Sequence, residues 1–71
     1  MTEVEVLINN FKDKENKNKQ IEIVRNKQGI LLNEGELLQK GDRYKITKER
    51  YNELSKLGIV VKAQKEKDKE D

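Results

Sequence analysis

The chain has 71 residues, of which 42% are charged and 32% hydrophobic, and its formal net charge is only +2. This length provides one small domain. The absence of Cys and His excludes disulfides and argues against a structural zinc site. No apolar stretch approaches the ~20 residues that a membrane-spanning helix needs, and the first residues lack the basic region of a signal peptide. We therefore expect synthesis in the cytoplasm and no membrane association.

The first half of the chain alternates between strand-like and polar stretches. Residues 3–8 place Val4, Val6 and Ile8 on one face, as a half-buried strand does. The run at 12–20 contains no apolar residue, so we expect an exposed loop. Alternation resumes at residues 20–25, which predicts a second strand that pairs with the first as an antiparallel hairpin.

Two leucine pairs follow a turn expected at residues 26–29. Successive side chains of a strand point to opposite faces, so each pair has one leucine without obvious cover. Either both leucines find core contacts at the domain edge, or an apolar strip stays exposed and marks a protein interface. The candidate partner-binding residues are Leu31, Leu32, Leu37 and Leu38.

The most clearly specified part of the chain is a strand–helix–strand unit in its second half. The two strands are expected at residues 43–46 and 59–61, and the helix between them at 48–57. Thr47 is a suitable N-cap because its hydroxyl can accept a hydrogen bond from a free backbone N–H. Gly58 is a suitable C′ residue because it readily adopts a left-handed conformation.

These elements predict an α+β fold with a small, mainly antiparallel sheet of about four or five short strands and one short helix. Residues 1–61 form the single domain, and the charged segment 62–71 is predicted to be a flexible tail. Phe11 is expected to cap one edge of the core. The expected core comprises Val4, Val6, Ile8, Ile21, Ile23, Tyr44, Ile46, Tyr51, Leu54, Leu57, Ile59 and Val61.

Catalytic chemistry is not predicted. Ser55 lies in the expected helix without a neighbouring base that would activate it. The carboxylate pairs Asp13/Glu15 and Asp42/Glu49 are expected to be solvated charges. The loop at 13–16 lacks the spacing and the glycine of an EF-hand. We expect a non-enzyme with no cofactor and no metal.

A basic loop beside a sheet could contact nucleic acid, because lysines neutralise phosphates and an exposed Phe11 could stack on a base. The candidate contacts are Lys12, Lys14, Lys17 and Lys19. Asp13 and Glu15 interrupt this cluster, and the near-neutral net charge does not favour a dedicated nucleic-acid binder.

Two blocks carry a family resemblance: VLINNFKDKE at residues 6–15 and KGDRYKITKERYNELSKLG at residues 40–58. They resemble small proteins encoded in the head-morphogenesis region of tailed phages and prophages of Gram-positive bacteria. The segment at 14–39 is longer than in that pattern, and no catalytic residues carry over.

The resemblance implies a β-rich domain with one short helix and a decoration or minor capsid role in the virion. Capsid or head–tail proteins would be its partners, and a homo-oligomer is compatible with so small a core, which rarely supplies more than about 3–5 kcal/mol. Two alternatives stay open. One is a small nucleic-acid-binding or regulatory protein, and the other is a phage-encoded inhibitor that docks on a host protein.

Overall fold

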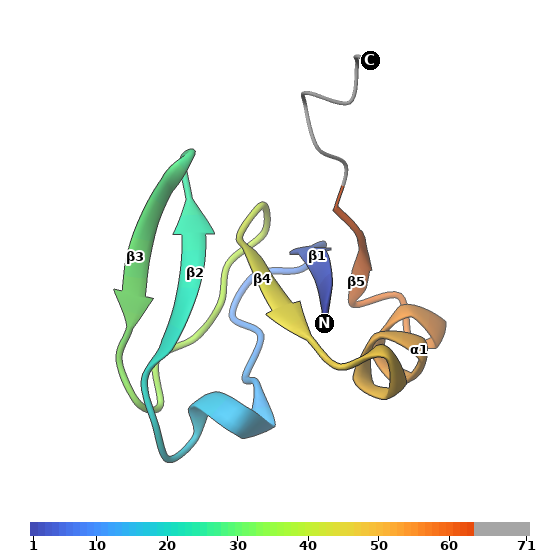
Figure 1. Cartoon of the computed structure of the whole chain (residues 1–71), viewed down its shortest axis with the longest axis horizontal. Helices are drawn as coiled ribbons and strands as arrows, with labels where there is room; N and C mark the ends of the chain where they lie inside the picture. Colours follow the sequence, from blue (N-terminus) through green and yellow to red (C-terminus); the bar gives the residue numbers. More distant parts are fainter. Residues whose placement is uncertain (64–71) are drawn as a thin grey trace.

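The computed structural model describes residues 1–63 and shows one five-stranded antiparallel sheet with one α-helix and a short 3-10 helix, η1 (Figure 1). The predicted α+β fold is confirmed. The tail predicted at residues 62–71 lies almost entirely outside the described residues, and the last strand includes Lys62. The elements are β1 (Thr2–Val6), η1 (Lys14–Asn16), β2 (Ile21–Arg25), β3 (Gln28–Leu32), β4 (Arg43–Ile46), α1 (Lys48–Lys56) and β5 (Val60–Lys62).

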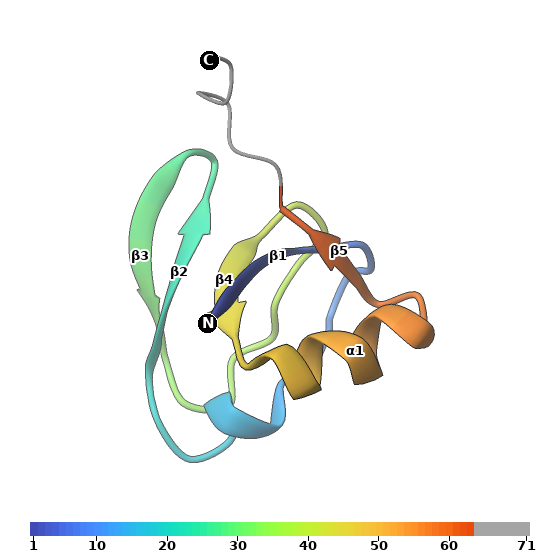
Figure 2. The same cartoon turned by 45° about the vertical axis from the view of Figure 1, so that its right-hand side comes forward.

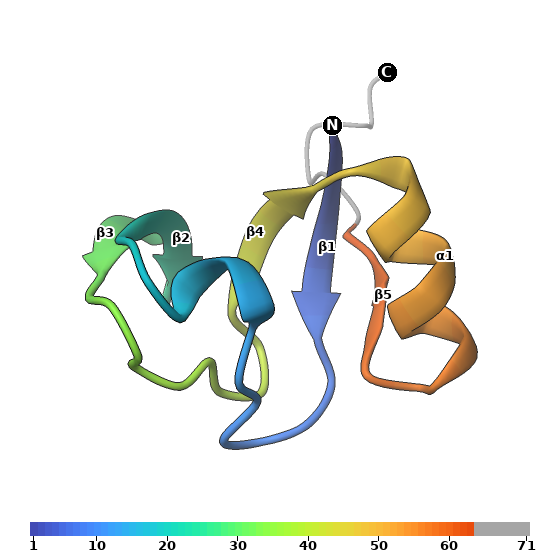
Figure 3. The same ribbon diagram turned by 90° about the horizontal axis from the view of Figure 1, so that it is seen from below.

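The strand order is β3-β2-β4-β1-β5, which Figure 3 shows from one end of the sheet to the other. The predicted hairpin between the first two strands is wrong, because β1 pairs with β4 and β5 while β2 pairs with β3 and β4. The polar run between β1 and β2 is not a hairpin connection. Part of this run folds into η1, and in the sheet β4 lies between β1 and β2.

The real hairpin joins β2 to β3. Its turn residues, Asn26 and Lys27, both have positive φ, at 56° and 66°. This is the backbone of a two-residue type I′ turn, whose twist matches that of the flanking strands. The hairpin lies at the opposite end of the sheet from α1, which packs against β5 and β1 (Figure 2).

The predicted caps of α1 are confirmed. The Thr47 hydroxyl accepts a hydrogen bond from the Arg50 N–H at 3.2 Å. At the other end Gly58 has a φ of +76°. Its N–H donates to the Ser55 carbonyl, and the Ile59 N–H donates to the Leu54 carbonyl, both at 3.0 Å. These are the two hydrogen bonds of a Schellman motif.

The buried core contains six of the residues expected there, namely Val4, Val6, Ile23, Tyr44, Ile46 and Leu54. Ile21, Tyr51 and Ile59 pack partly buried against it. Phe11 belongs to the core itself, together with the unexpected Leu32, Leu38 and Val60.

Three core predictions are wrong. Ile8 is exposed because β1 ends at Val6, two residues earlier than expected. Val61 is exposed because its neighbour Val60 takes the inward position of β5. Leu57 is 69% exposed at the C-cap of α1.

Candidate functional site

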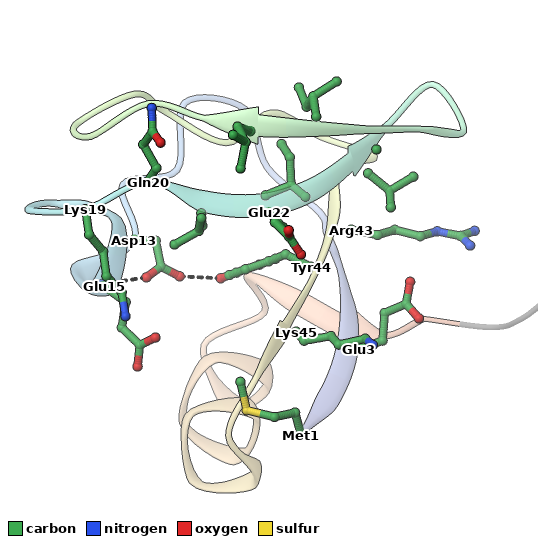
Figure 4. A pocket seen from close by; sticks show the side chains of 16 residues that line it. Met1, Glu3, Asp13, Glu15, Lys19, Gln20, Glu22, Arg43, Tyr44 and Lys45 are labelled. Atoms are coloured by element: carbon green, nitrogen blue, oxygen red, sulfur yellow. Dashed lines mark hydrogen bonds between the residues drawn. The ribbon is translucent and has the colours of Figure 1, made fainter.

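The main polar cluster is centred on Asp13, which is only 1% exposed. Asp13 is the N-cap of η1, where its Oδ1 accepts a hydrogen bond from the Glu15 N–H at 2.7 Å. Its Oδ2 accepts one from the Tyr44 hydroxyl at 2.5 Å. Arg50, from α1, donates to Oδ1 at 3.1 Å and to Oδ2 at 3.5 Å. Figure 4 shows the carboxylate between Glu15 and Tyr44.

This cluster ties three elements together, because Asp13 precedes η1, Tyr44 lies on β4 and Arg50 on α1. Burial raises the pKa of the Tyr44 phenol, and the hydrogen bond to Asp13 raises it further. The phenol therefore remains a proton donor to the carboxylate. The expectation that Asp13 is a solvated charge is wrong, since both of its oxygens are occupied inside the fold.

A second buried carboxylate, Asp42, holds the β2–β3 hairpin in place. Arg25 at the end of β2 binds it through two hydrogen bonds, Nε to Oδ1 at 2.9 Å and Nη2 to Oδ2 at 2.7 Å. The Gln39 N–H also donates to Oδ2, at 2.8 Å. The hydrogen bonds with Asp42 raise the pKa of the Arg25 guanidinium. This fork geometry is the strong, orienting form of an ion pair.

Asn16 joins η1 to the loop after β3. Its side-chain Nδ2 donates to the Glu36 backbone carbonyl, and its backbone carbonyl accepts from the Gly35 N–H, both at 2.8 Å. The Asn16 side chain is buried, although residues 12–20 were expected to form an exposed loop. Polar residues of this loop thus replace apolar ones in anchoring it.

A groove of about 830 Å³ lies where β2 and β4 diverge (Figure 4). The two strands share only the pairs Ile23–Tyr44 and Val24–Arg43. Charged side chains of both signs line the opening, among them Glu3, Glu22 and Lys45. Acids and bases are mixed there, so the groove favours neither an anion nor a cation. Within residues 1–63 no group of acidic side chains could hold a metal ion.

The structure separates the members of each leucine pair. Leu31 and Leu37 are 57% and 37% exposed, whereas Leu32 and Leu38 are buried. Leu32 occupies an inward position of β3, and Leu38 forms an isolated bridge with Phe11. The prediction that all four contact a partner is therefore corrected, because Leu32 and Leu38 belong to the core.

The candidate nucleic-acid contacts, Lys12, Lys14, Lys17 and Lys19, are all exposed on and around η1. Phe11 is buried and paired with Leu38, so this fold does not offer it for base stacking. Glu15 lies among the lysines and is half-exposed, and it approaches Arg50 at 3.8 Å. The Ser55 hydroxyl donates to the Asn52 carbonyl at 3.3 Å.

Sequence reasoning missed the roles of Asp13, Asn16 and Asp42, which had been interpreted as loop or turn residues, and of Arg25, which had been placed at the end of a predicted strand. Asp13 could have been identified as the N-cap of a short helical turn at residues 14–16, because Asp is a favoured N-cap residue.

No protein-family model, curated protein or solved structure matches the chain. Over the described residues, the helices are too short and too polar to cross a membrane.

Proposed function

We propose that this chain is a non-enzymatic structural protein of a tailed-phage particle, associated with the capsid or the head–tail region in a decoration or minor capsid role. The proposal is carried by one observation. The two blocks that resemble phage head-region proteins, residues 6–15 and 40–58, meet in a single buried cluster. Asp13 comes from the first block, and Tyr44 and Arg50 come from the second.

This arrangement supports a scaffold role for the shared residues. Asp13 accepts hydrogen bonds at both oxygens, and its ion pair with Arg50 is buried on the Asp13 side. The donors to this carboxylate, namely the Glu15 N–H, the Tyr44 hydroxyl and two N–H groups of Arg50, all belong to the fold, which favours a structural role for Asp13. The polar residues of the two blocks hold the fold together, which favours a protein that acts by binding.

The segment between the blocks supplies a surface for binding. It contains the β2–β3 hairpin and the exposed side chains of Leu31 and Leu37. Contiguous exposed apolar patches mark protein contacts, and in this proposal Leu31 and Leu37 contribute to one. On a particle, weak contacts repeated over many copies give strong overall attachment.

Mass spectrometry of purified particles tests the proposal. The polypeptide should be present at a fixed ratio to the major capsid protein after a high-salt wash, and the ratio distinguishes shell decoration from a neck ring. The control is the lysate of infected cells, which establishes that the protein is made. Abundance in the lysate together with absence from particles would eliminate the virion role.

The exposed lysines around η1 favour nucleic-acid binding as a second candidate. Such binding should weaken steeply as salt rises, because phosphate contacts release counterions. Replacing Lys12, Lys14, Lys17 and Lys19 with Gln should then reduce both the affinity and the salt dependence. A regulatory protein or an inhibitor of a host protein would instead bind one partner in the cell and be missing from particles.

A further inference from the structure

β3 forms one edge of the sheet, and within residues 1–63 its hydrogen-bonded strand partner is β2 alone (Figure 1). The type I′ turn closes with a hydrogen bond between the flanking residues, Arg25 and Gln28. Hydrogen-bonded and non-hydrogen-bonded pairs alternate along an antiparallel ladder. The pairs Val24–Gly29 and Glu22–Leu31 are therefore the non-hydrogen-bonded pairs of this ladder. The backbone N–H and C=O groups of Gly29 and Leu31 consequently point away from β2, toward the outer edge of the sheet.

The composition of this edge is unusual for a strand exposed to water. Proteins commonly protect open edges with Lys, Pro or a bulge. The five residues of β3, QGILL, include no charge and no Pro. Leu31 is 57% exposed, and a side chain at Gly29 would meet no atom within 4 Å.

Charges of opposite sign lie at the two ends of β3. Lys27 precedes the strand and Glu34 follows it, and both are exposed. A parallel neighbour with the same sequence would bring like charges together. An antiparallel neighbour with the same sequence brings the Lys27 end of each strand to the Glu34 end of the other, so that opposite charges lie within one position of each other.

We propose that β3 pairs antiparallel with β3 of a second copy, with Ile30 opposite Ile30. In this register Leu31 lies opposite Gly29 of the second copy, where the side chain finds open space. The outward N–H and C=O groups of these two residues then form reciprocal hydrogen bonds, as a two-fold symmetric contact requires. The two Leu31 side chains become diagonal neighbours on one face, roughly 7–8 Å apart.

The dimer joins two five-stranded sheets into one and buries the unprotected edge. It uses Leu31 and leaves Leu37, which lies outside β3, available to another protein. The inference is independent of the proposed virion role, because it requires only a second copy of this chain.

Sedimentation equilibrium of the purified full chain tests the dimer. The wild type should show twice the monomer mass with a concentration-dependent equilibrium. Leu31→Lys places two ammonium groups beside each other and should raise the dimer dissociation constant at least about tenfold. Leu57→Lys, the same change at the exposed C-cap leucine of α1, is the matched control and should leave the dissociation constant unchanged. Circular dichroism verifies that each variant is folded.

A charge exchange tests the antiparallel register. Lys27→Glu and Glu34→Lys should each weaken the dimer, and the double variant should restore it, because each opposite-charge pair is re-formed in reverse. Amide exchange gives a residue-level readout. The Gly29 and Leu31 amides should become protected as protein concentration rises.

Three results would overturn the inference. The first is a monomer at every concentration, and the second is a dimer insensitive to Leu31→Lys. The third is protection of the Gly29 and Leu31 amides only after a different protein is added. That last outcome would assign the edge to another partner and reject pairing with a second copy.

Discussion

Replacing Asp13 with Asn removes the charge from the buried cluster while conserving the size of the side chain. The amide group offers one acceptor oxygen where the carboxylate offers two. Its NH₂ group must then face the donors of Glu15, Tyr44 or Arg50. The Tyr44 hydroxyl could reorient to accept from this group, but Arg50 donates to both positions of the carboxylate, so an N–H of Arg50 faces the NH₂ group in either orientation. The change also removes the counter-ion of Arg50.

The expected cost is large relative to the stability of so small a domain. Breaking a buried ion pair by removing one partner costs roughly 3–5 kcal/mol. Arg50 is 15% exposed and can also approach Glu15 at 3.8 Å, so water and Glu15 compensate part of the loss. We therefore expect about 3 kcal/mol, the low end of this range. A domain of this size rarely has more than about 3–5 kcal/mol in total, so Asp13→Asn should leave it at the edge of unfolding.

Urea denaturation followed by circular dichroism measures this change in the free energy of unfolding. Glu15→Gln is the control, because Glu15 is half-exposed, and it should cost less than about 1 kcal/mol. Tyr44→Phe removes one charge-assisted hydrogen bond and should cost about 1.5–3 kcal/mol. In the double variant the two costs should not add, since both changes disrupt one cluster. A cost below about 1 kcal/mol for Asp13→Asn would refute the reasoning, because a loss of stability that small is expected for a solvated surface carboxylate.

Three further outcomes are expected. The raised pKa of Tyr44 means that the folded state holds the phenolic proton more tightly than the unfolded state. This contribution to stability is complete below about pH 10 and declines as pH rises above it, and Tyr44→Phe should flatten the decline in urea unfolding measured against pH. Gly58→Val should destabilise the chain by about 1–2 kcal/mol, because a β-branched residue is forced to positive φ. Gly58→Asn should destabilise it less, and thermal unfolding of both variants measures the difference. Arg25→Met leaves the buried Asp42 without its fork partner, so amide exchange should accelerate selectively in β2 and β3 while α1 keeps its protection.

The strand–helix–strand unit was predictable because its determinants are local in sequence. Thr47 caps α1 through a hydrogen bond to a residue three positions away. The Schellman hydrogen bonds likewise join residues within five positions of one another. Signals of this range can be recognised by spacing alone.

The sheet order was not predictable in the same way, because it depends on contacts between distant residues. Alternation identifies β1 and β2 as strands but says nothing about which strands are neighbours. The pairing of β1 with β4 joins residues that are 38 positions apart at Glu5–Arg43 and 44 positions apart at Thr2–Ile46. Two strands that follow each other in sequence pair readily when a short turn connects them, whereas the connection between β1 and β2 contains η1.

The polar residues of the site were missed for a related reason. A charged residue in a charged run looks solvated unless its partner is known, and the partners of Asp13 lie 31 and 37 positions away. Asp42 binds Arg25 across 17 positions. The leucine pairs illustrate the same limit, because alternation indicated that one of each pair faces inward but not which one.

The two buried carboxylates divide the molecule into a scaffold and an attached arm. Asp13 joins the resembling blocks through Tyr44 and Arg50, whereas Asp42 of the second block binds Arg25 of the hairpin. The hairpin is joined to the scaffold by this forked ion pair and by the short β2–β4 pairing. The core side chains of Ile23 and Leu32 and the hydrogen bonds of Asn16 in η1 with the loop after β3 add to this attachment. An arm connected in this way can change its exposed residues, such as Leu31, without disturbing the Asp13 cluster. A partner-specific surface is best placed on such an element, because selection for binding there does not compete with the interactions that keep the domain folded.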